Sequence, residues 1–231
     1  AMSAACLRSA GLTVGLYTSP HLREFRERVR VMTPDDSDGR IPEASFVSCM
    51  DQVRAGLEHV EGITWFEIVT ALAFLYFAER QVDVAVVEVG LGGRLDATNV
   101  LLPEVSVITS LSLDHTQLLG DTLTEIAYEK GGIIKPGIPV VSSSQRPEAM
   151  IKIEEIARDR GAPLTVVGQD WHFDSQREHH DGGTDQTLII LDGPDPAFIP
   201  PGSAFHLALA GEHQLENATV ALAALEHVRA L

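Results

Sequence analysis

The residues best suited to chemistry gather around Glu88, within segment 82–100. β-Branched residues dominate 82–89, a pattern typical of a central parallel strand that is covered on both faces. A carboxylate buried in such a strand normally pairs with a cation or binds a metal. Three glycines within 90–93 follow at once, where the backbone can turn sharply and approach a ligand closely. The stretch predicts a ligand site at the carboxyl end of a strand or, equally, a structural salt bridge followed by a glycine turn.

Other polar groups also follow predicted strands. Ser19 comes after a strand expected over 12–17, and His115 comes after a strand expected over 104–110. Ser19 is a candidate metal or phosphate ligand, although a serine before proline is more often part of a turn. His115 could be a ligand, an acid or base, or an ordinary loop histidine. Lys130 ends a predicted helix, where its charge complements the helix dipole.

Two charged segments each have a structural and a functional interpretation. Segment 23–31 carries four arginines and two glutamates. It is either a solvated surface, the default for such a segment, or a clamp for a carboxylate or phosphate. The run 178–183 contains adjacent histidines and could bind a metal, but a hairpin loop is the more common use of such a run.

The elements that must position these residues follow from hydrophobic patterns. Thr64 and Glu67 form a capping box that predicts the start of a helix over 65–80. This helix is apolar around most of its surface, so we expect it to be buried against a sheet, with Trp65 and Phe66 exposed in its first turn. Strands and helices then alternate from residue 82 onwards. This pattern predicts an α/β fold with a mostly parallel sheet flanked by helices.

The pattern of the sequence changes at residue 171. Short strands are expected at 171–173, 187–191 and 204–209, separated by Gly, Pro and Asp clusters. They predict a small antiparallel layer within 171–209. A last helix, rich in Ala and Leu, follows to the end of the chain. The length of the chain suits one large α/β domain or a domain and part of another, and we expect residues 1–231 to belong to one domain.

Composition excludes several classes of protein. The net charge of −16 argues against nucleic acid and against anionic membrane surfaces as partners. The longest apolar run, 68–78, is too short to span a bilayer. Two cysteines do not make a disulfide framework, and no signal peptide pattern is visible. A cytoplasmic enzyme fits these features best.

Six stretches of the chain resemble motifs of one known family and occur in the same order as in that family. The family is folylpolyglutamate synthase, including its bifunctional dihydrofolate synthase form, within the Mur ligase superfamily. The matching stretches are 15–22, 64–67, 88–99, 114–120, 129–137 and 213–218. The block 88–99 is the most specific of them. This resemblance implies a Mur-ligase-like ATPase domain.

The resemblance also implies an activity and its cofactors. Similar enzymes are monomeric ATP-dependent amide ligases that add L-glutamate to dihydropteroate or to a folate through an acyl phosphate. They use Mg²⁺ to neutralise the charge of the transferred phosphoryl group. The resemblance assigns this Mg²⁺ to Ser19, Glu88 and His115, and assigns catalytic roles to Glu88, His115 and Lys130. In similar enzymes a carbamylated lysine stands at the position of Lys130.

The resemblance assigns the substrates to further positions. Asn217 falls at a nucleotide contact, at the start of the last helix. The pterin of the acceptor is expected to lie against two stretches that contain Thr64, Trp65, Phe66, Glu67, Leu95, Asp96 and Ala97.

The sequence departs from the family pattern in three respects. The phosphate loop expected just before Ala1 and the domain expected after Leu231 are not among these residues. Gly131 stands where the family commonly has alanine. We therefore expect the 231 residues alone not to turn over. The alternatives are another Mur-type ligase with a UDP-linked peptide acceptor, and a truncated, non-catalytic domain that binds a pterin; 64–67 and 95–97 favour a folate.

Overall fold

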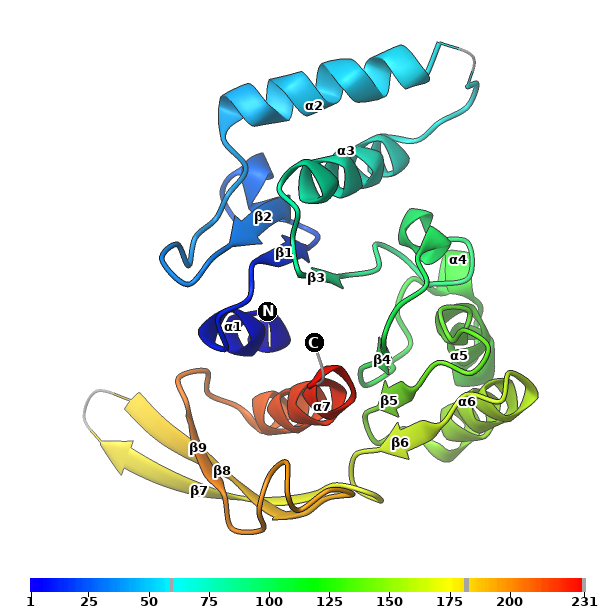
Figure 1. Cartoon of the computed structure of the whole chain (residues 1–231). Coiled ribbons are helices and arrows are strands. Elements are labelled where there is room, and N and C mark those ends of the chain that lie inside the picture. Colours follow the sequence, from blue (N-terminus) through cyan, green and yellow to red (C-terminus); the bar gives the residue numbers. More distant parts are fainter. Residues whose placement is uncertain (59, 181–182, 230–231) are drawn as a thin grey trace. The chain divides into compact units, whose positions relative to one another are not determined.

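The computed structural model of the chain describes residues 1–58, 60–180 and 183–229 (Figure 1). The chain divides into two compact units, Ala1–Leu101 and Leu102–Leu231. Each unit has a sheet with helices packed on it. Among the described residues no helix is long and apolar enough to cross a membrane.

The first unit is built on a three-stranded sheet of order β2-β1-β3. The central strand β1 pairs parallel with β3 and antiparallel with β2, and its last residue, Tyr17, lies opposite both Val87 and Val29. The strands are β1 (Val14–Tyr17), β2 (Val29–Met32) and β3 (Val84–Val87). Because β1 and β3 are parallel, the loops after them leave the sheet at the same edge.

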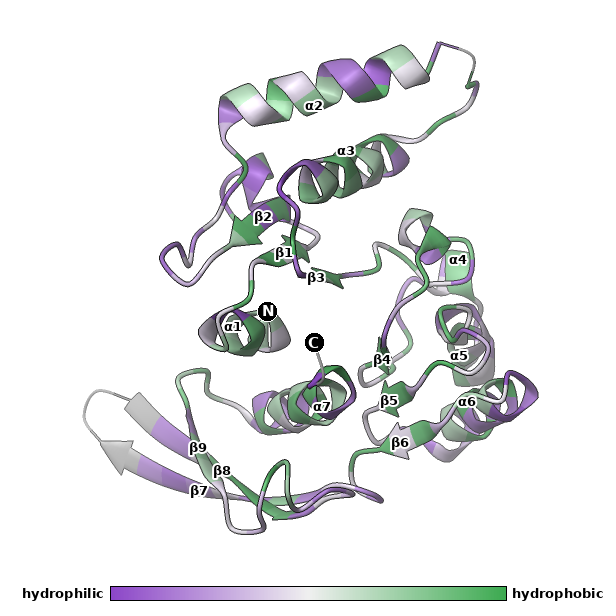
Figure 2. Ribbon diagram, viewed as in Figure 1, coloured by the Kyte–Doolittle hydropathy of each residue, from purple (hydrophilic) through white to green (hydrophobic). Residues whose placement is uncertain are grey.

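Helices cover both faces of this sheet (Figure 1). The helices are α1 (Met2–Ser9), α2 (Glu43–Gly56) and α3 (Trp65–Glu79), with 3-10 turns at Phe25–Arg28 and Ala97–Val100. In Figure 2, α3 is mostly in the hydrophobic colour, whereas α2 is mixed. A Cβ at Gly15 would lie 3.0 Å from the ring of Phe77, so glycine lets α3 pack closely on β1.

The capping box at the N-terminal end of α3 is formed as predicted, but Phe66, which was expected to be exposed, is partly buried against the core. The Thr64 side chain accepts a hydrogen bond from the backbone N–H of Glu67, whose carboxylate accepts one in return from the backbone N–H of Thr64. Buried α3 side chains such as Leu72, together with Tyr17 and Ile41, form the core of this unit. The predicted burial of the helix is confirmed.

One expectation for the first unit is wrong, and one segment contains a strand that was not predicted. The strand expected over 82–89 spans only Val84–Val87, and its side chains are partly or fully exposed instead of covered on both faces. The reason is that β3 pairs with β1 alone in the described sheet and is an edge strand. Segment 23–31, interpreted only as a charged surface or clamp, contains a 3-10 turn and the start of the buried strand β2.

The second unit contains a parallel sheet of order β4-β5-β6. In Figure 1, α5 and α6 lie on one face of this sheet and α7 on the other. The elements are β4 (Ser106–Ile108), α4 (Thr116–Leu119), α5 (Leu123–Gly131), β5 (Val140–Ser142), α6 (Pro147–Asp159), β6 (Leu164–Val166) and α7 (Glu212–Val228). The N-cap of α5 is Thr122, whose side chain accepts a hydrogen bond from the backbone N–H of Glu125. The short helix α4 was not predicted.

The expected antiparallel layer is confirmed as the sheet β7-β8-β9. Its strands are β7 (His172–His180), β8 (Gly183–Asp192) and β9 (Ala204–Leu207), so the first two are longer than predicted. On β8 the buried side chain of Gln186 donates to the backbone oxygens of Leu209 and Gly211. This polar side chain joins the antiparallel sheet to the segment that begins α7.

Candidate active site

The candidate site lies where β1 and β3 end. The backbone N–H of Ser19 donates to Oε2 of Glu88 at 2.8 Å, and the backbone N–H of Glu88 donates to the carbonyl of Tyr17. The sequence correctly placed Ser19 after the end of its strand. Glu88 was expected inside a strand over 82–89 but follows the last residue of β3, and the parallel register makes it a neighbour of Ser19. The expected burial of Glu88 is wrong: its side chain is exposed at the sheet edge, because β3 has a neighbour on one side only.

Asp96 organises the glycine loop that follows Glu88. Its Oδ2 accepts the backbone N–H groups of Gly90 and Leu91, each at 3.0 Å. Its Oδ1 accepts the backbone N–H and the hydroxyl of Thr98, at 2.9 and 2.6 Å. Four bonds to one carboxylate hold the loop in one shape and compensate the charge of Asp96 locally.

The aromatic ring of Phe66 lies directly against this loop. A Cβ built on Gly90 would be 2.4 Å from Cζ of Phe66, a separation that real atoms do not adopt. Glycine at this position therefore allows the loop to touch the ring. The contact brings together two stretches that the sequence could only name separately.

A hydrogen-bond chain in the interior of the unit anchors the backbone of Phe66. The hydroxyl of Thr70 donates to the carbonyl of Phe66 at 2.8 Å, so the hydroxyl of Tyr17, 3.0 Å away, donates to Thr70. The Tyr17 ring lies 5.9 Å from that of Phe66. Burial raises the pKa of the Tyr17 hydroxyl, and the bond to Thr70 opposes part of that shift. The chain fixes the first turn of α3 on β1.

These groups surround a pocket of about 380 Å³. Its lining mixes apolar and polar side chains from three parts of the first unit: Ser19, Pro20, Arg28, Phe66, Gly90, Leu91 and Asp96. Three of the predicted site residues, Ser19, Phe66 and Asp96, are among them. Trp65 and Leu95 are exposed, at 57% and 79%, in the stretches that also supply Phe66 and Asp96.

The loop after Ser19 is shaped by a carboxylate that sequence reasoning did not single out. Glu27 accepts the backbone N–H groups of Leu22, Arg23 and Glu24, at 2.8, 3.3 and 3.1 Å. These bonds, the one from Leu22 first, lower the pKa of the Glu27 carboxyl. The Glu67 carboxyl also has a lowered pKa, because the hydroxyl and backbone N–H of Thr64 donate to it.

The remaining predicted residues belong to the second unit. His115 precedes α4 with φ of 51°, in the left-handed region, and its exposed ring lies 3.7 Å from the carboxylate of Asp114. Lys130 is half-buried in the last turn of α5, and its side chain makes no hydrogen bond or ion pair within the described part of this unit. Asn217 is half-buried in the first turns of α7. Their assembly with Ser19 and Glu88 remains a prediction.

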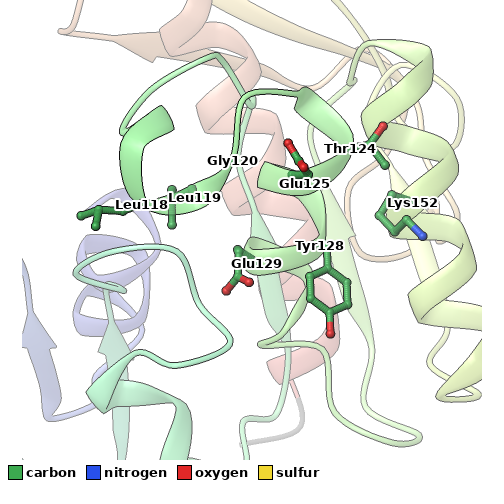
Figure 3. Close-up of a pocket in the computed structure, with 8 residues that line it drawn as sticks. All are labelled: Leu118, Leu119, Gly120, Thr124, Glu125, Tyr128, Glu129 and Lys152. Atoms are coloured by element: carbon green, nitrogen blue, oxygen red, sulfur yellow. The ribbon is translucent and has the colours of Figure 1, made fainter.

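The second unit has a pocket of its own, of about 470 Å³, between α4, α5 and α6 (Figure 3). It contains none of the predicted site residues. Of its charged lining groups, Lys152 forms an ion pair with Glu155 at 2.5 Å, and Glu125 accepts the cap bonds of α5 from Thr122. These charges are therefore used within the fold, and the pocket is not the candidate site.

The histidine-rich run 178–183 was a weak candidate for a metal site. Residues 181 and 182 of this run lie outside the described residues. In the described part of the chain, no group of three or more His, Cys, Asp or Glu side chains could hold a metal ion.

Comparison with known proteins gives concordant matches. The family model of the Mur ligase middle domain matches residues 51–225. Folylpolyglutamate synthase of Lacticaseibacillus casei is 40% identical over 228 residues, covering 94% of this chain and 49% of that protein. Dihydrofolate synthase/folylpolyglutamate synthase of Bacillus subtilis (strain 168) is 36% identical over 238 residues, covering 95% of this chain and 50% of that protein.

A solved structure agrees with these relatives. The FPGS-AMPPCP-folate complex superposes with a TM-score of 0.86 at 38% identity, covering 98% of this chain and 53% of that chain. The present chain thus spans about half the length of the curated relatives it matches.

Proposed function

Because the chain belongs to the Mur ligase family through its match to the middle domain, we propose that it is the ATP-binding domain of an ATP-dependent ligase. The reaction we propose is the joining of L-glutamate to dihydropteroate, to a folate, or to both. The intact enzyme would serve the synthesis and retention of folates. We propose that residues 1–231 act as one such domain within a longer protein.

One observation carries this proposal. The pocket at the ends of β1 and β3 is lined by Ser19 and Phe66, and the backbone N–H of Ser19 donates to Glu88, so two oxygen ligands adjoin an aromatic side chain. A ligase for a pterin-bearing acid needs both features, since a phosphoryl group must be transferred to an acid that carries a flat aromatic ring. The relatives named above and the folate-bound complex support the assignment.

The oxygen groups of the first unit suit Mg²⁺. This cation prefers oxygen ligands and keeps several of its waters. One oxygen of Glu88 accepts the N–H of Ser19, which leaves the other oxygen and the Ser19 hydroxyl to face a cation. His115 would be the third ligand, and a nitrogen ligand is unusual for so hard an ion. When bound, Mg²⁺ would neutralise charge on the phosphoryl group during transfer.

The protein's own groups then have distinct roles. In the proposed reaction the acceptor carboxylate attacks the γ-phosphorus of ATP, which gives an acyl phosphate and ADP. The glutamate amine attacks the acyl carbon next, and phosphate leaves with the C–O bond electrons. Carbamylation of Lys130 would replace its positive charge with a negative one, and the half-buried side chain has no competing partner in its described unit.

The substrate positions are proposed as follows. The pterin would lie against the first turn of α3 and the loop held by Asp96. Asn217 would contact the nucleotide. The residues proposed for the pterin are Thr64, Trp65, Phe66, Glu67, Leu95, Asp96 and Ala97. The cytoplasmic location is proposed from the composition of the chain, and the monomeric state from the resemblance of its sequence motifs.

The experiment that tests the proposal compares acceptors by competition binding. Dihydropteroate, folate and a UDP-muramoyl peptide are titrated against this chain, with and without MgATP. We expect dihydropteroate or folate to bind and the UDP-linked peptide not to compete. Preference for the UDP-linked peptide would instead identify another Mur-type ligase. Pterin binding that does not respond to MgATP would favour a non-catalytic binding domain.

A further inference from the structure

The four arginines of segment 23–31 have different partners. Arg26 forms ion pairs with Glu24 and Glu43. Arg30 donates to the backbone carbonyl of Glu27 and lies 3.6 Å from a carboxylate oxygen of Asp38. Both guanidinium groups are therefore neutralised within the fold, and neither lines the pocket at the ends of β1 and β3.

Arg28 is the arginine of this segment that lines that pocket. Its Nε donates to Nδ1 of His21 at 3.0 Å, and its guanidinium carbon lies 5.3 Å from the ring centre of Phe25. The Phe25 ring is in turn 5.6 Å from Trp65. One neutral hydrogen bond and one cation–π contact thus hold the guanidinium in place.

Most N–H donors of the Arg28 guanidinium remain available to a ligand in the described first unit. Arginine has five N–H donors, and His21 occupies one of those on Arg28. Within the described first unit, the terminal nitrogens of Arg28 have no hydrogen-bond acceptor and no carboxylate partner. In the described first unit, neither carboxylate of this site forms an ion pair with Arg28: Asp96 accepts hydrogen bonds from its own loop and Glu88 from Ser19. A fixed, unneutralised guanidinium fork is suited to bidentate binding of an anion.

The other residues that line the pocket indicate which class of anion Arg28 would bind. Pro20, Phe66 and Leu91 form an apolar wall beside Arg28, which suits an aromatic ring better than a chain of phosphates. We propose that Arg28 binds a carboxylate of the acceptor acid, and that His21 is a positioning residue that holds the Arg28 guanidinium. This inference rests on the proposed function and adds to it the residue that recognises the acid group.

The test uses Trp65 as a reporter in the whole chain. The chain has two tryptophans. Trp65 is 57% exposed and Trp171 only 1%, so a ligand in the pocket should quench mainly Trp65. The probes are pteroate, which has a single carboxylate, and the same molecule with a carboxamide in its place. Dissociation constants are measured for the parent chain, Arg28→Ala, Arg28→Lys and the control Arg23→Ala, which changes an exposed arginine of the same segment.

We expect Arg28→Ala to weaken pteroate roughly 10- to 100-fold and to change carboxamide binding less than about twofold, since charged hydrogen bonds to the carboxylate are lost. Arg28→Lys should recover part of the loss, because it keeps the charge but not the fork. Arg23→Ala should bind both probes like the parent chain. His21→Ala should reduce the preference for pteroate, and His21→Gln, which retains an acceptor, should restore part of it.

Other outcomes would overturn the inference. Equal losses for pteroate and the carboxamide would assign Arg28 a structural role, which urea unfolding of the same variants would reveal. Unchanged pteroate binding by Arg28→Ala would remove Arg28 from recognition and leave the proposed function standing. A selective loss of MgATP binding would assign Arg28 to the nucleotide. Failure of the parent chain to bind pteroate would remove both this inference and the proposed function.

Discussion

The loop after Glu88 and the loop that carries His115 both follow parallel strands, yet they are held differently. The first is closed by four bonds to the carboxylate of Asp96 and packs on Phe66. In the second loop, the backbone N–H of His115 donates to the carboxylate of Asp114. The backbone carbonyl of His115 accepts the N–H groups of Leu118 and Leu119 at the start of α4. Its ring is exposed.

The difference separates two ways of supplying a reactive group. In the first unit the loop, the sheet edge and the first turn of α3 determine one another, so geometry exists before a ligand arrives. Pre-organisation of this kind reduces the cost of binding. In the described part of its own unit, His115 has no comparable support. We therefore expect changes around Gly90 and Phe66 to have larger effects than changes around the candidate residues of the second unit.

The largest effect is expected for Gly90→Ala. The new Cβ would stand 2.4 Å from the Phe66 ring, so either the loop or the ring must move. We expect a loss of stability of about 3 kcal/mol, at the upper end of the usual cost of overpacking. Binding of pteroate, followed by Trp65 quenching, should weaken by tenfold or more. Urea unfolding of the parent chain and of Gly90→Ala measures the loss of stability.

Gly56→Ala is the matched control for this change. Gly56 is the last residue of α2, and a Cβ there would meet nothing within 4 Å. Alanine should leave pteroate binding unchanged and stabilise the chain by a few tenths of a kcal/mol up to about 1 kcal/mol. If both glycine substitutions had the same effect, close contact between the loop and Phe66 would not be what organises the site.

The next effect is expected for the hydrogen-bond chain under Phe66. Thr70→Val removes the acceptor of the Tyr17 hydroxyl, which is then buried without a partner, at a cost of about 1–2 kcal/mol. Tyr17→Phe should cost less, because Thr70 keeps its bond to the Phe66 carbonyl. In the double variant the second change should cost little. Additive losses in urea unfolding would mean that the two hydroxyls do not act together.

Local signals made part of this site predictable. The capping box of Thr64 and Glu67 lies within one helical turn, so the sequence alone indicates it, and the structure confirms it. Ser19 and the glycine turn after Glu88 were predicted at strand ends, and the carboxyl ends of parallel strands share an edge. The antiparallel layer followed from the strand lengths and the turn residues between them.

The features that the sequence did not predict depend on contacts between residues distant in the chain. The covered faces expected for β3 required a neighbour on each side, and the described sheet gives it only one. Strand β2 was missed because Arg30 lies between buried residues, and its charge is compensated by Asp38, which belongs to a later loop. The role of Gly90 depends on Phe66, more than twenty positions earlier in the chain.

A smaller effect, dependent on pH, is expected for Glu27→Gln. The folded chain lowers the pKa of Glu27, so this carboxylate stabilises the fold above its unfolded pKa of about 4.3. The contribution is lost as the pH falls through the lowered folded value. Urea midpoints measured from pH 7 down to about pH 3 should therefore differ between the parent chain and the variant at neutral pH and converge in acid. Glu58→Gln, at an exposed glutamate, is the control.

A gap between the parent chain and Glu27→Gln that widened in acid would contradict this account, since it would require a raised pKa in the folded state. A gap that stayed constant with pH would assign Glu27 a role in packing instead of in accepting the three N–H groups after Ser19.

The smallest effect is expected beside Lys130, where the sequence has Gly131 in place of the alanine that the family resemblance leads us to expect. A Cβ at Gly131 would lie 2.6 Å from Cδ1 of Ile156, the mobile end of a side chain on α6. Alanine gains helix propensity of up to about 1 kcal/mol, and displacement of Ile156 offsets much of that gain. We expect Gly131→Ala to change stability by less than about 0.5 kcal/mol in urea unfolding.

Removing Cδ1 of Ile156 should let the gain in helix propensity at residue 131 appear in the measured stability. Ile156→Val lacks the Cδ1 atom and should cost about 0.5–1.5 kcal/mol by itself. Added to that variant, Gly131→Ala should stabilise by about 0.5–1 kcal/mol, because the new methyl group then fills the vacated space. Equal effects of Gly131→Ala in the two backgrounds would mean that Ile156 does not limit residue 131. The coupling would then be absent, and the glycine beside Lys130 would have no explanation in packing.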